Sequence, residues 1–178
     1  MSDIVIFVAL ADEFAGPVPD GMVLVHTGVG KVNAALAAAA ALVEHKPFLA
    51  INYGTAGGLT IDHGGLIECG ATVQRDMDLR PLGLALGTTF GDEEPPMIRW
   101  AEGPVVGTGD SFADGPPELA SDLVDMEAYA LAKACHRHGV AFRCVKYVSD
   151  SADDGAADDW QDNKMKGARR FAEWLTAL

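Results

Sequence analysis

The chain has 178 residues, of which 49% are hydrophobic and 7% aromatic, so it has the size of one domain that can bury a core. Its 13 Lys and Arg residues against 26 Asp and Glu residues give a net charge of -13, which opposes binding to nucleic acid or to an anionic membrane surface. The apolar segment Ile4–Leu10 is too short to span a membrane, and no basic segment or cleavage site accompanies it. We therefore expect residues 1–178 to form a single cytoplasmic domain that binds neither nucleic acid nor membranes.

Apolar segments flanked by Gly or Asp predict a series of strands along the chain. In order they are Ile4–Leu10, Met22–His26, Phe48–Tyr53, Ala71–Gln74, Pro104–Thr108 and Val140–Val148. Helical patterns cover Lys31–Glu44, Glu127–His138 and Asp158–Ala177. Strands that alternate with helices predict an α/β fold, a three-layer αβα sandwich around a mixed, largely parallel sheet.

Three glycine-rich turns follow predicted strands, at Thr27–Asn33, Asn52–Gly58 and Gly107–Ala113. The backbone of such a turn can come close to a ligand, and in a parallel sheet the turns would converge on one edge. Gly28 is the candidate ligand contact of the first turn, which precedes a helix N-terminus and is neither a P-loop nor a complete dinucleotide motif. A plain tight turn, and for Phe112 a core position, are the simpler alternatives.

Two acidic motifs lie near the ends of predicted elements, at Leu123–Ala128 and Lys146–Asp153. Asp150 follows the last predicted strand, at the end where open α/β sheets bind ligands. Glu127 begins a predicted helix, and Asp125 suits the cap of that helix. A single carboxylate at such a position is most often a cap or a loop residue, but two motifs together indicate a site.

Nothing in the sequence indicates a metal or an organic cofactor. Cys69, Cys135 and Cys144 lack metal-ligand spacing, and their odd number argues against a disulfide framework, so we expect reduced, mostly buried thiols. The acidic stretch Asp150–Asp162 lacks the residue order and the closing Glu of a calcium loop. It precedes the basic segment Lys164–Arg170, an arrangement that suits the dipole of a terminal helix.

Five motifs in order along the chain resemble the nucleoside phosphorylase/hydrolase superfamily, and within it the methylthioadenosine/adenosylhomocysteine nucleosidases. They are Gly28–Ala35, Asn52–Gly58, Gly107–Phe112, Val124–Ala128 and Val148–Asp150. The resemblance implies an enzyme, an N-glycosyl hydrolase that uses water to split an adenine-type nucleoside, such as methylthioadenosine or adenosylhomocysteine, into free base and sugar. It also implies the three-layer fold predicted above, a homodimer and no cofactor.

The resemblance assigns the two catalytic roles to carboxylates near opposite ends of the chain. Asp150 matches the acid that protonates the purine at N7 or hydrogen-bonds to it, with Ser149 as a supporting contact, and Glu13 matches the base that activates water. Phe112 matches the ring that stacks on the purine, and the backbone of Ala113 matches the group that contacts its edge. These residue types suit the reaction, because cleavage leaves negative charge on the base and positive charge on the sugar.

The resemblance assigns the sugar contacts to a second group of residues. Glu127 matches the carboxylate that binds the 2'- and 3'-hydroxyls of ribose, and Met126 matches the residue beneath the sugar. Thr55 and Gly57 match a hydroxyl and a glycine that lie close to the sugar and the base. A carboxylate can accept two hydroxyl hydrogen bonds and so supply binding energy away from the bond that breaks.

The sequence departs from the phosphorylase branch, which holds phosphate with arginines near the first glycine turn and before the second. The first Arg here is Arg75, and Asn52 stands before the second turn, so hydrolysis is favoured over phosphorolysis. The alternatives are a phosphate-dependent purine nucleoside phosphorylase, a non-catalytic nucleoside-binding protein and a Rossmann-type oxidoreductase, the last of which rests on Gly28 and Gly30 alone.

The region Gln74–Met97 matches the family poorly. In the family this region and a neighbouring subunit form the pocket for the five-prime substituent, so futalosine, a deoxyadenosine or a 7-deazapurine nucleoside stay open as substrates. The overlapping Gly- and Pro-rich stretch Leu79–Ile98 predicts a loop that covers a pocket, meets a partner subunit or projects from the surface. Together with the resemblance, its apolar residues favour a homodimer.

Overall fold

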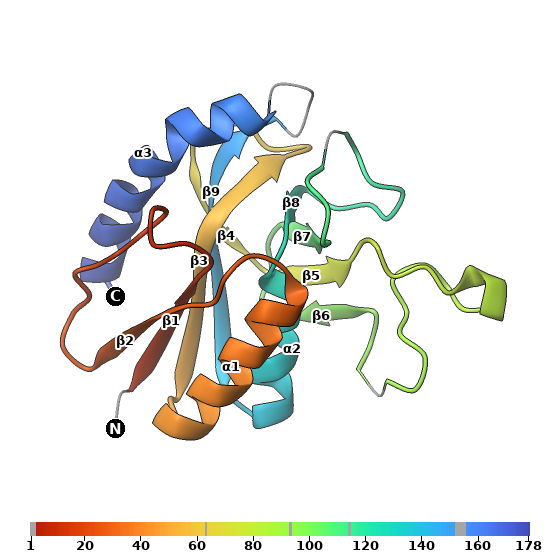
Figure 1. Cartoon of the computed structure of the whole chain (residues 1–178), viewed down its shortest axis with the longest axis horizontal. Coiled ribbons are helices and arrows are strands. Elements are labelled where there is room, and N and C mark those ends of the chain that lie inside the picture. The colour runs from red at the N-terminus through yellow and green to blue at the C-terminus, as the bar shows by residue number, and fades with distance from the viewer. Residues whose placement is uncertain (1–2, 63, 93, 114, 152–155) are drawn as a thin grey trace.

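The computed structural model describes residues 3–62, 64–92, 94–113, 115–151 and 156–178, and for residues 156–162 and 164 it describes the backbone alone. Within these residues one sheet has nine strands and carries helices on both faces (Figure 1). The strands are β1 (Ile4–Val8), β2 (Met22–His26), β3 (Leu49–Gly58), β4 (Leu66–Cys69), β5 (Ala71–Gln74), β6 (Met97–Arg99), β7 (Val105–Thr108), β8 (Leu123–Asp125) and β9 (Ala141–Asp150). The helices are α1 (Lys31–His45), α2 (Ala128–His138), α3 (Ala156–Thr176) and the short 3-10 helix η1 (Arg80–Leu82).

The strand order is β2-β1-β3-β8-β7-β5-β6, and β9 pairs with both β3 and β4. Parallel pairing joins β1 to β2 and β3, β3 to β9, and β7 to β5 and β8. Antiparallel pairing joins β3 to β8, β4 to β9 and β5 to β6. The prediction of a mixed, largely parallel sheet between helical layers is therefore confirmed.

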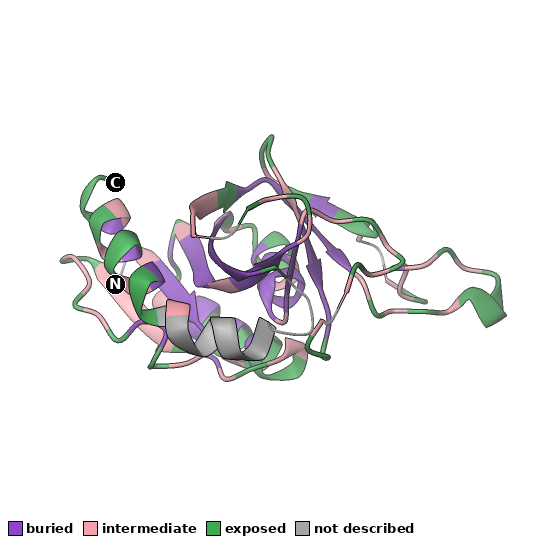
Figure 2. Ribbon diagram, turned by 90° about the horizontal axis from the view of Figure 1, so that it is seen from above, coloured by how far each residue is buried: buried purple, intermediate pink, exposed green. Residues whose placement is uncertain are grey.

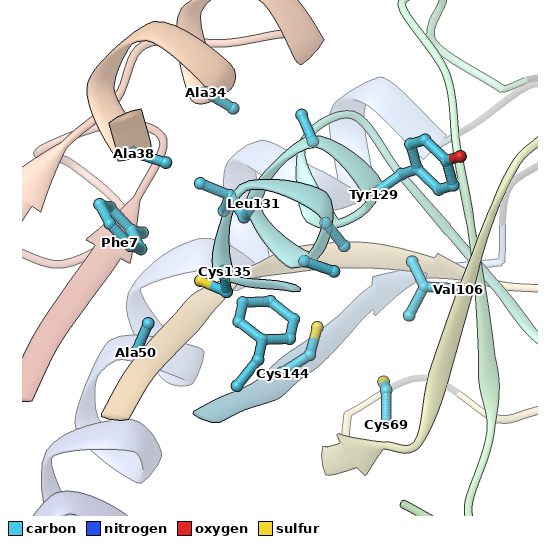
Figure 3. Close-up of a cluster of buried hydrophobic side chains, with 14 of the residues drawn as sticks. Phe7, Ala34, Ala38, Ala50, Cys69, Val106, Tyr129, Leu131, Cys135 and Cys144 are labelled. Carbon is cyan, nitrogen blue, oxygen red and sulfur yellow. The ribbon is translucent and has the colours of Figure 1, made fainter. Parts of the chain in front are cut away.

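Two apolar cores lie on opposite faces of the sheet, and each is covered by different helices. The first core lies under α1 and α2, where the small side chains Ala34 and Ala38 let α1 pack closely beside Phe7 and Leu131 (Figure 3). The second core lies under α3. There the rings of Tyr53 and Phe171 stack with centroids 4.0 Å apart, a geometry worth about 0.5–1.5 kcal/mol beyond the buried area.

The predicted strands and helices all form, but the structure corrects their extents and adds elements. The segment Asn52–Gly58, expected to be a turn, continues β3 to Gly58, because β9 pairs with it on one side and β8 on the other. Strand β9 likewise reaches Asp150. The additional strands β4, β6 and β8 have three or four residues each, too few to show a periodic pattern.

Residues 77–92 and 94–96 belong to an extended arm that leaves the body of the molecule between β5 and β6 and carries η1 (Figure 2). The returning segment of the arm is held against α2 by ion pairs. Lys133 pairs with Asp92, and Arg137 pairs with Asp92 at 2.9 Å and also with Glu94. The described residues of the arm do not line the cavity described below, so the arm does not cover that cavity in its own chain.

Some expectations concern residues that the structure does not describe. Asp153 and Asp154, and the side chains of Asp158, Asp159, Trp160 and Asp162, lie outside the described residues, so the predictions for the acidic stretch stay untested. The three cysteines are free and buried, as predicted. Among the described helices, none combines the length and the apolar character needed to cross a membrane.

Candidate active site

A cavity of ≈ 210 Å³ opens at the carboxyl ends of β1, β3, β5, β7, β8 and β9. Ligands of open α/β sheets bind at this edge. All of the residues predicted to form the site, except Gly28, line this cavity. They are Glu13, Thr55, Gly57, Phe112, Ala113, Met126, Glu127, Ser149 and Asp150.

Gly28 is not part of the cavity wall. Its φ of 79° lies in the left-handed region that favours glycine, and its N–H donates to the carbonyl of Ala9 at 3.0 Å. The turn that it makes brings the next residue, Val29, to the wall instead. Gly28 therefore shapes the turn, and the structure gives no support for a ligand contact at this residue.

Glu13 is held in one orientation by three hydrogen-bond donors. The backbone N–H and the hydroxyl of Thr55 donate to Glu13 Oε1 at 2.9 and 2.7 Å, and the N–H of Leu10 donates to Oε2 at 3.2 Å. The side chain is 4% exposed, so these bonds satisfy a carboxylate that has left bulk water. The carboxylate consequently has a defined position on the wall, where it faces the cavity from the end of β1.

Asp150 reaches the wall from the end of β9, where the pairing with β3 is irregular. The register shifts between Ala56 and Gly57, and such a bulge redirects the side chains of the strand. The hydroxyl of Ser149 donates to Asp150 Oδ2 at 2.7 Å, and Asn163 of α3 donates to the carbonyl of Ser149 at 2.9 Å. Asp150 is 4% exposed, so a second buried carboxylate faces the same cavity as Glu13.

Glu127 is the N-cap residue of α2, and its carboxylate contacts the N-cap of α1. The N–H of Gly30 donates to Glu127 Oε1 at 2.8 Å. Burial, reinforced by the nearby charge of Asp125, raises the pKa of Glu127 to about 7, although Lys146 and the Gly30 N–H act in the opposite direction. Glu127 therefore changes its charge close to neutral pH.

Asp125 has more contacts than the helix-cap role predicted for it. It does cap α2, since the N–H groups of Ala128 and Glu127 donate to Asp125 Oδ2 at 2.8 and 3.3 Å. The hydroxyl of Thr108 also donates to Oδ1 at 2.5 Å, and Lys146 Nζ lies 2.8 Å from Oδ2. Sequence reasoning assigned no role to Lys146, although a lysine inside a strand that is apolar apart from Arg143, four residues before Asp150, was a visible signal.

The loop that carries Phe112 is held at its base by hydrogen bonds that involve charged side chains. Asp110 accepts a hydrogen bond from the N–H of Lys31 at 2.7 Å, and its own N–H donates to Asp76 at 2.8 Å. Arg75 donates to the backbone carbonyl and the hydroxyl of Ser111. Phe112 itself is 54% exposed at the cavity wall, so it is not a core anchor.

Several wall residues were absent from the predicted site. They are Ala9, Leu10, Val29, Ala56, Arg75, Ser111, Val124 and Asp125. Arg75 had a signal in the sequence, because it directly follows the predicted strand Ala71–Gln74 at the edge where sites form. Within the described part of the chain, no three His, Cys, Asp or Glu side chains converge in a way that would hold a metal ion.

The raised pKa of Glu127 predicts a specific effect on stability. A carboxyl group whose pKa is higher in the folded than in the unfolded protein stabilises the fold at low pH, and this contribution is lost as pH rises from about 4.5 to about 7. Glu127→Gln removes the titration, so urea unfolding should show a stability gain of at most about 3 kcal/mol at pH 8 and little gain at pH 4.5. Equal differences between variant and parent at both pH values would contradict the assignment.

Comparison with known proteins shows which family this chain resembles. The family model described as "Phosphorylase superfamily" matches residues 16–98 and 93–178. A 5'-methylthioadenosine/S-adenosylhomocysteine nucleosidase from Marinomonas sp. is 31% identical over 160 residues, which cover 74% of this chain and 68% of the relative. The enzyme of the same name from Anoxybacillus flavithermus is 30% identical over 188 residues, covering 88% and 79%.

Solved structures show the same fold. The Neisseria meningitidis 5'-methylthioadenosine/S-adenosylhomocysteine nucleosidase, in complex with methylthio-immucillin-A, superimposes with a TM-score of 0.83 at 24% identity and covers 100% of both chains. A futalosine hydrolase mutant from Helicobacter pylori superimposes with a TM-score of 0.87 at 20% identity, covering 99% of this chain and 97% of the other. The sequence matches and the shared fold together show that the chain belongs to the phosphorylase superfamily and, within it, to the family of the 5'-methylthioadenosine/S-adenosylhomocysteine nucleosidases.

Proposed function

We propose that this chain is an N-glycosyl hydrolase that splits an adenine-type nucleoside, such as methylthioadenosine or adenosylhomocysteine, into free base and sugar. One observation carries the proposal: Glu13 and Asp150, from opposite ends of the chain, are buried carboxylates on the wall of the same cavity. The nucleosidase names of the sequence relatives support it. Glu13 lines the cavity and does not point away from it, which favours turnover over a non-catalytic binding protein.

In the proposed reaction Asp150 assists the departure of the base. As the bond to the sugar breaks, negative charge develops on the purine, and a carboxylic acid beside N7 neutralises that charge by giving its proton. The hydroxyl of Ser149 fixes the orientation of the Asp150 carboxyl group. The half-exposed ring of Phe112 offers an apolar face on which a purine can stack.

Glu13 is the proposed general base. Its carboxylate first stabilises the positive charge that develops on the sugar. As a water molecule beside it attacks the anomeric carbon, the carboxylate then takes a proton from that water, and the sugar charge is neutralised by the new bond to oxygen. The bonds from Thr55 and Leu10 support this role, because they hold the carboxylate in place before the substrate arrives. Glu127 and Met126 are then available to bind the sugar from the start of α2.

The charges around the cavity favour water over phosphate as the second substrate. The described wall carries the acidic residues Glu13, Asp125, Glu127 and Asp150 against the single basic residue Arg75. The N-terminus of α1 could attract an anion, but its N–H groups at Gly30 and Lys31 already donate to Glu127 and Asp110. Even with Asp150 protonated, the acidic residues of the described wall outnumber Arg75, so a phosphate ion would meet net negative charge there.

A panel of nucleosides tests the reaction directly. Methylthioadenosine, adenosylhomocysteine, deoxyadenosine, futalosine and a 7-deazapurine nucleoside are incubated with the protein, and free base and reducing sugar are measured with and without phosphate. We expect release from an adenine nucleoside at a rate that phosphate does not increase. A rate that depends on phosphate would instead indicate a phosphorylase.

Removing either proposed catalytic group should abolish turnover without abolishing binding. Glu13→Gln and Asp150→Asn keep the size of the side chains and remove the base or the acid, so kcat should fall by about 10²–10⁴-fold. Nucleoside affinity, measured by calorimetry, should change much less, because the sugar contacts remain. Glu44→Gln on the exposed side of α1 is a matched control. A variant of Glu13 or Asp150 with full turnover would contradict the role assigned to that residue.

We further propose that the protein acts as a homodimer. Val32, Leu36 and Val43 lie on one side of α1 and are exposed, with 68% of Leu36 accessible. Leu82 and Phe90 are exposed on the arm, which projects away from the body of the molecule (Figure 2). Exposed apolar surface on a projecting segment fits a second copy of the chain, which would bury both patches by twofold symmetry.

The α1 surface gives a test of the dimer. Leu36→Asp places a charge at its centre, so the variant should be monomeric by light scattering after size-exclusion chromatography, while the parent chain is dimeric. Leu178→Asp, the same change at an exposed leucine at the end of α3, should leave the dimer intact. A monomeric parent chain, or a dimeric Leu36→Asp variant, would contradict this interface.

Two further features concern the cellular compartment and the domain organisation of the protein. The three free and buried cysteines suit a reducing compartment, and we infer that the protein works in the cytoplasm. The cavity draws on residues from Ala9 to Asp150, so we infer that residues 1–178 act as one domain.

A further inference from the structure

The most deeply buried cation near the cavity is Lys146 of β9, which lies behind the wall and not on it. Its ammonium group is 2.8 Å from Asp125 Oδ2, and both side chains are 1% exposed. Burial alone would lower the pKa of Lys146, but the charges of Asp125 and Glu127 outweigh it and leave that pKa above the usual value. Lys146 is therefore a fixed positive charge inside the protein.

Asp125 links this charge to the start of α2. Its Oδ2 atom accepts the N–H of Ala128 in addition to Lys146, and its Oδ1 atom accepts the hydroxyl of Thr108. The same hydroxyl accepts the N–H of Tyr129 at 3.0 Å. The ion pair thus sits in a network that fixes the first turn of α2, the turn that presents Glu127 to the cavity.

Glu127 would be poorly placed without Lys146. Its carboxylate is buried two residues after Asp125, and two such carboxylates close together oppose each other's ionisation. The charged or polar groups that face Glu127 are Asp125 from β8, Lys146 from β9, Glu13 from the segment after β1, and the Gly30 N–H from α1. Among these groups, Lys146 is the one that carries a full positive charge.

We propose that Lys146 is a positioning residue, whose buried ammonium group offsets the charge of Asp125 and so allows Glu127 to bind the sugar hydroxyls as an anion in a fixed place. The proposal rests on the sugar-binding role of Glu127 in the proposed function. A buried ion pair is seldom needed for stability alone, since apolar side chains of similar size often replace such pairs without loss. Because the Lys146–Asp125 pair lies beside Glu127, which lines the cavity, a role in function explains why the pair is present.

The test measures binding of formycin A, an adenosine analogue in which a carbon–carbon bond joins base and sugar, so that hydrolysis cannot cleave it. Calorimetry between pH 5.5 and 9 (roughly the range in which Glu127 titrates) gives the pH below which affinity is lost. In Lys146→Met this limit, the pH below which formycin A affinity is lost, should rise by about one pH unit or more. Below that pH, each further pH unit lowers the affinity about tenfold. Lys146→Arg, which keeps the charge, should keep the limit near that of the parent chain.

The double variant Lys146→Met/Asp125→Asn separates charge from structure. It removes both buried charges, so the limit should return toward the parent value even though the ion pair is gone. Circular dichroism shows which variants fold. If Lys146→Met does not fold, Asp125→Asn alone takes its place: it removes the carboxylate and keeps the ammonium group, so the limit should move down, and an unmoved limit would contradict the proposal. A folded Lys146→Met variant with an unmoved limit, or a double variant whose limit lies as high as one unit above the parent, would overturn the proposal. Failure of the parent chain to release adenine would contradict the proposed hydrolysis and leave this binding result intact.

Discussion

The parallel pairing of β3 with β9 is the constraint on which the cavity depends. The two strands run side by side from Leu49 and Ala141 to Gly57 and Asp150, and the register shift near their ends directs Ser149 and Asp150 toward the opening. The glycines of β3 let the chain stay extended between β9 and β8 without side chains to fill the space. Thr55 on the same strand holds Glu13, so one strand pair positions both proposed catalytic carboxylates.

Several acidic side chains are buried around the cavity. Hydrogen-bond donors and Lys146, which come from other parts of the fold, stabilise them there. Glu13 is satisfied by donors from β3 and from its own turn, Asp125 by Lys146 and the start of α2, and Glu127 by the start of α1. Each carboxylate thus depends on elements that are distant in the sequence. A pocket of this kind is suited to a reaction in which positive charge develops on a sugar, and it is unsuited to an anionic second substrate.

Much of the fold and of the candidate site could be predicted because the relevant signals are local. The order of strands and helices, the alanine-rich helix α1, and the positions of Asp150 and Glu127 near element ends all follow from short-range patterns. The missed features depend on distant partners. The glycine segment up to Gly58 is a strand only because β8 and β9 pair with it, and Lys146 is tolerated in a buried strand only because Asp125 lies 2.8 Å away. Val29 in place of Gly28 at the wall follows from the geometry of a single turn.

The α/β class, the order of the elements and the residue types that this chemistry requires can be inferred from the amino-acid sequence, because periodicity, glycine turns and carboxylates at strand ends are properties of short segments. The folded chain is needed to show which of these residues share one cavity, how each carboxylate is held, and which charges offset one another. Distances between residues such as Glu13 and Thr55, or Asp125 and Lys146, depend on strand pairing across the whole sheet. Burial and neighbouring charge then set the pKa of Glu127, because both depend on groups that the chain brings together only when it folds.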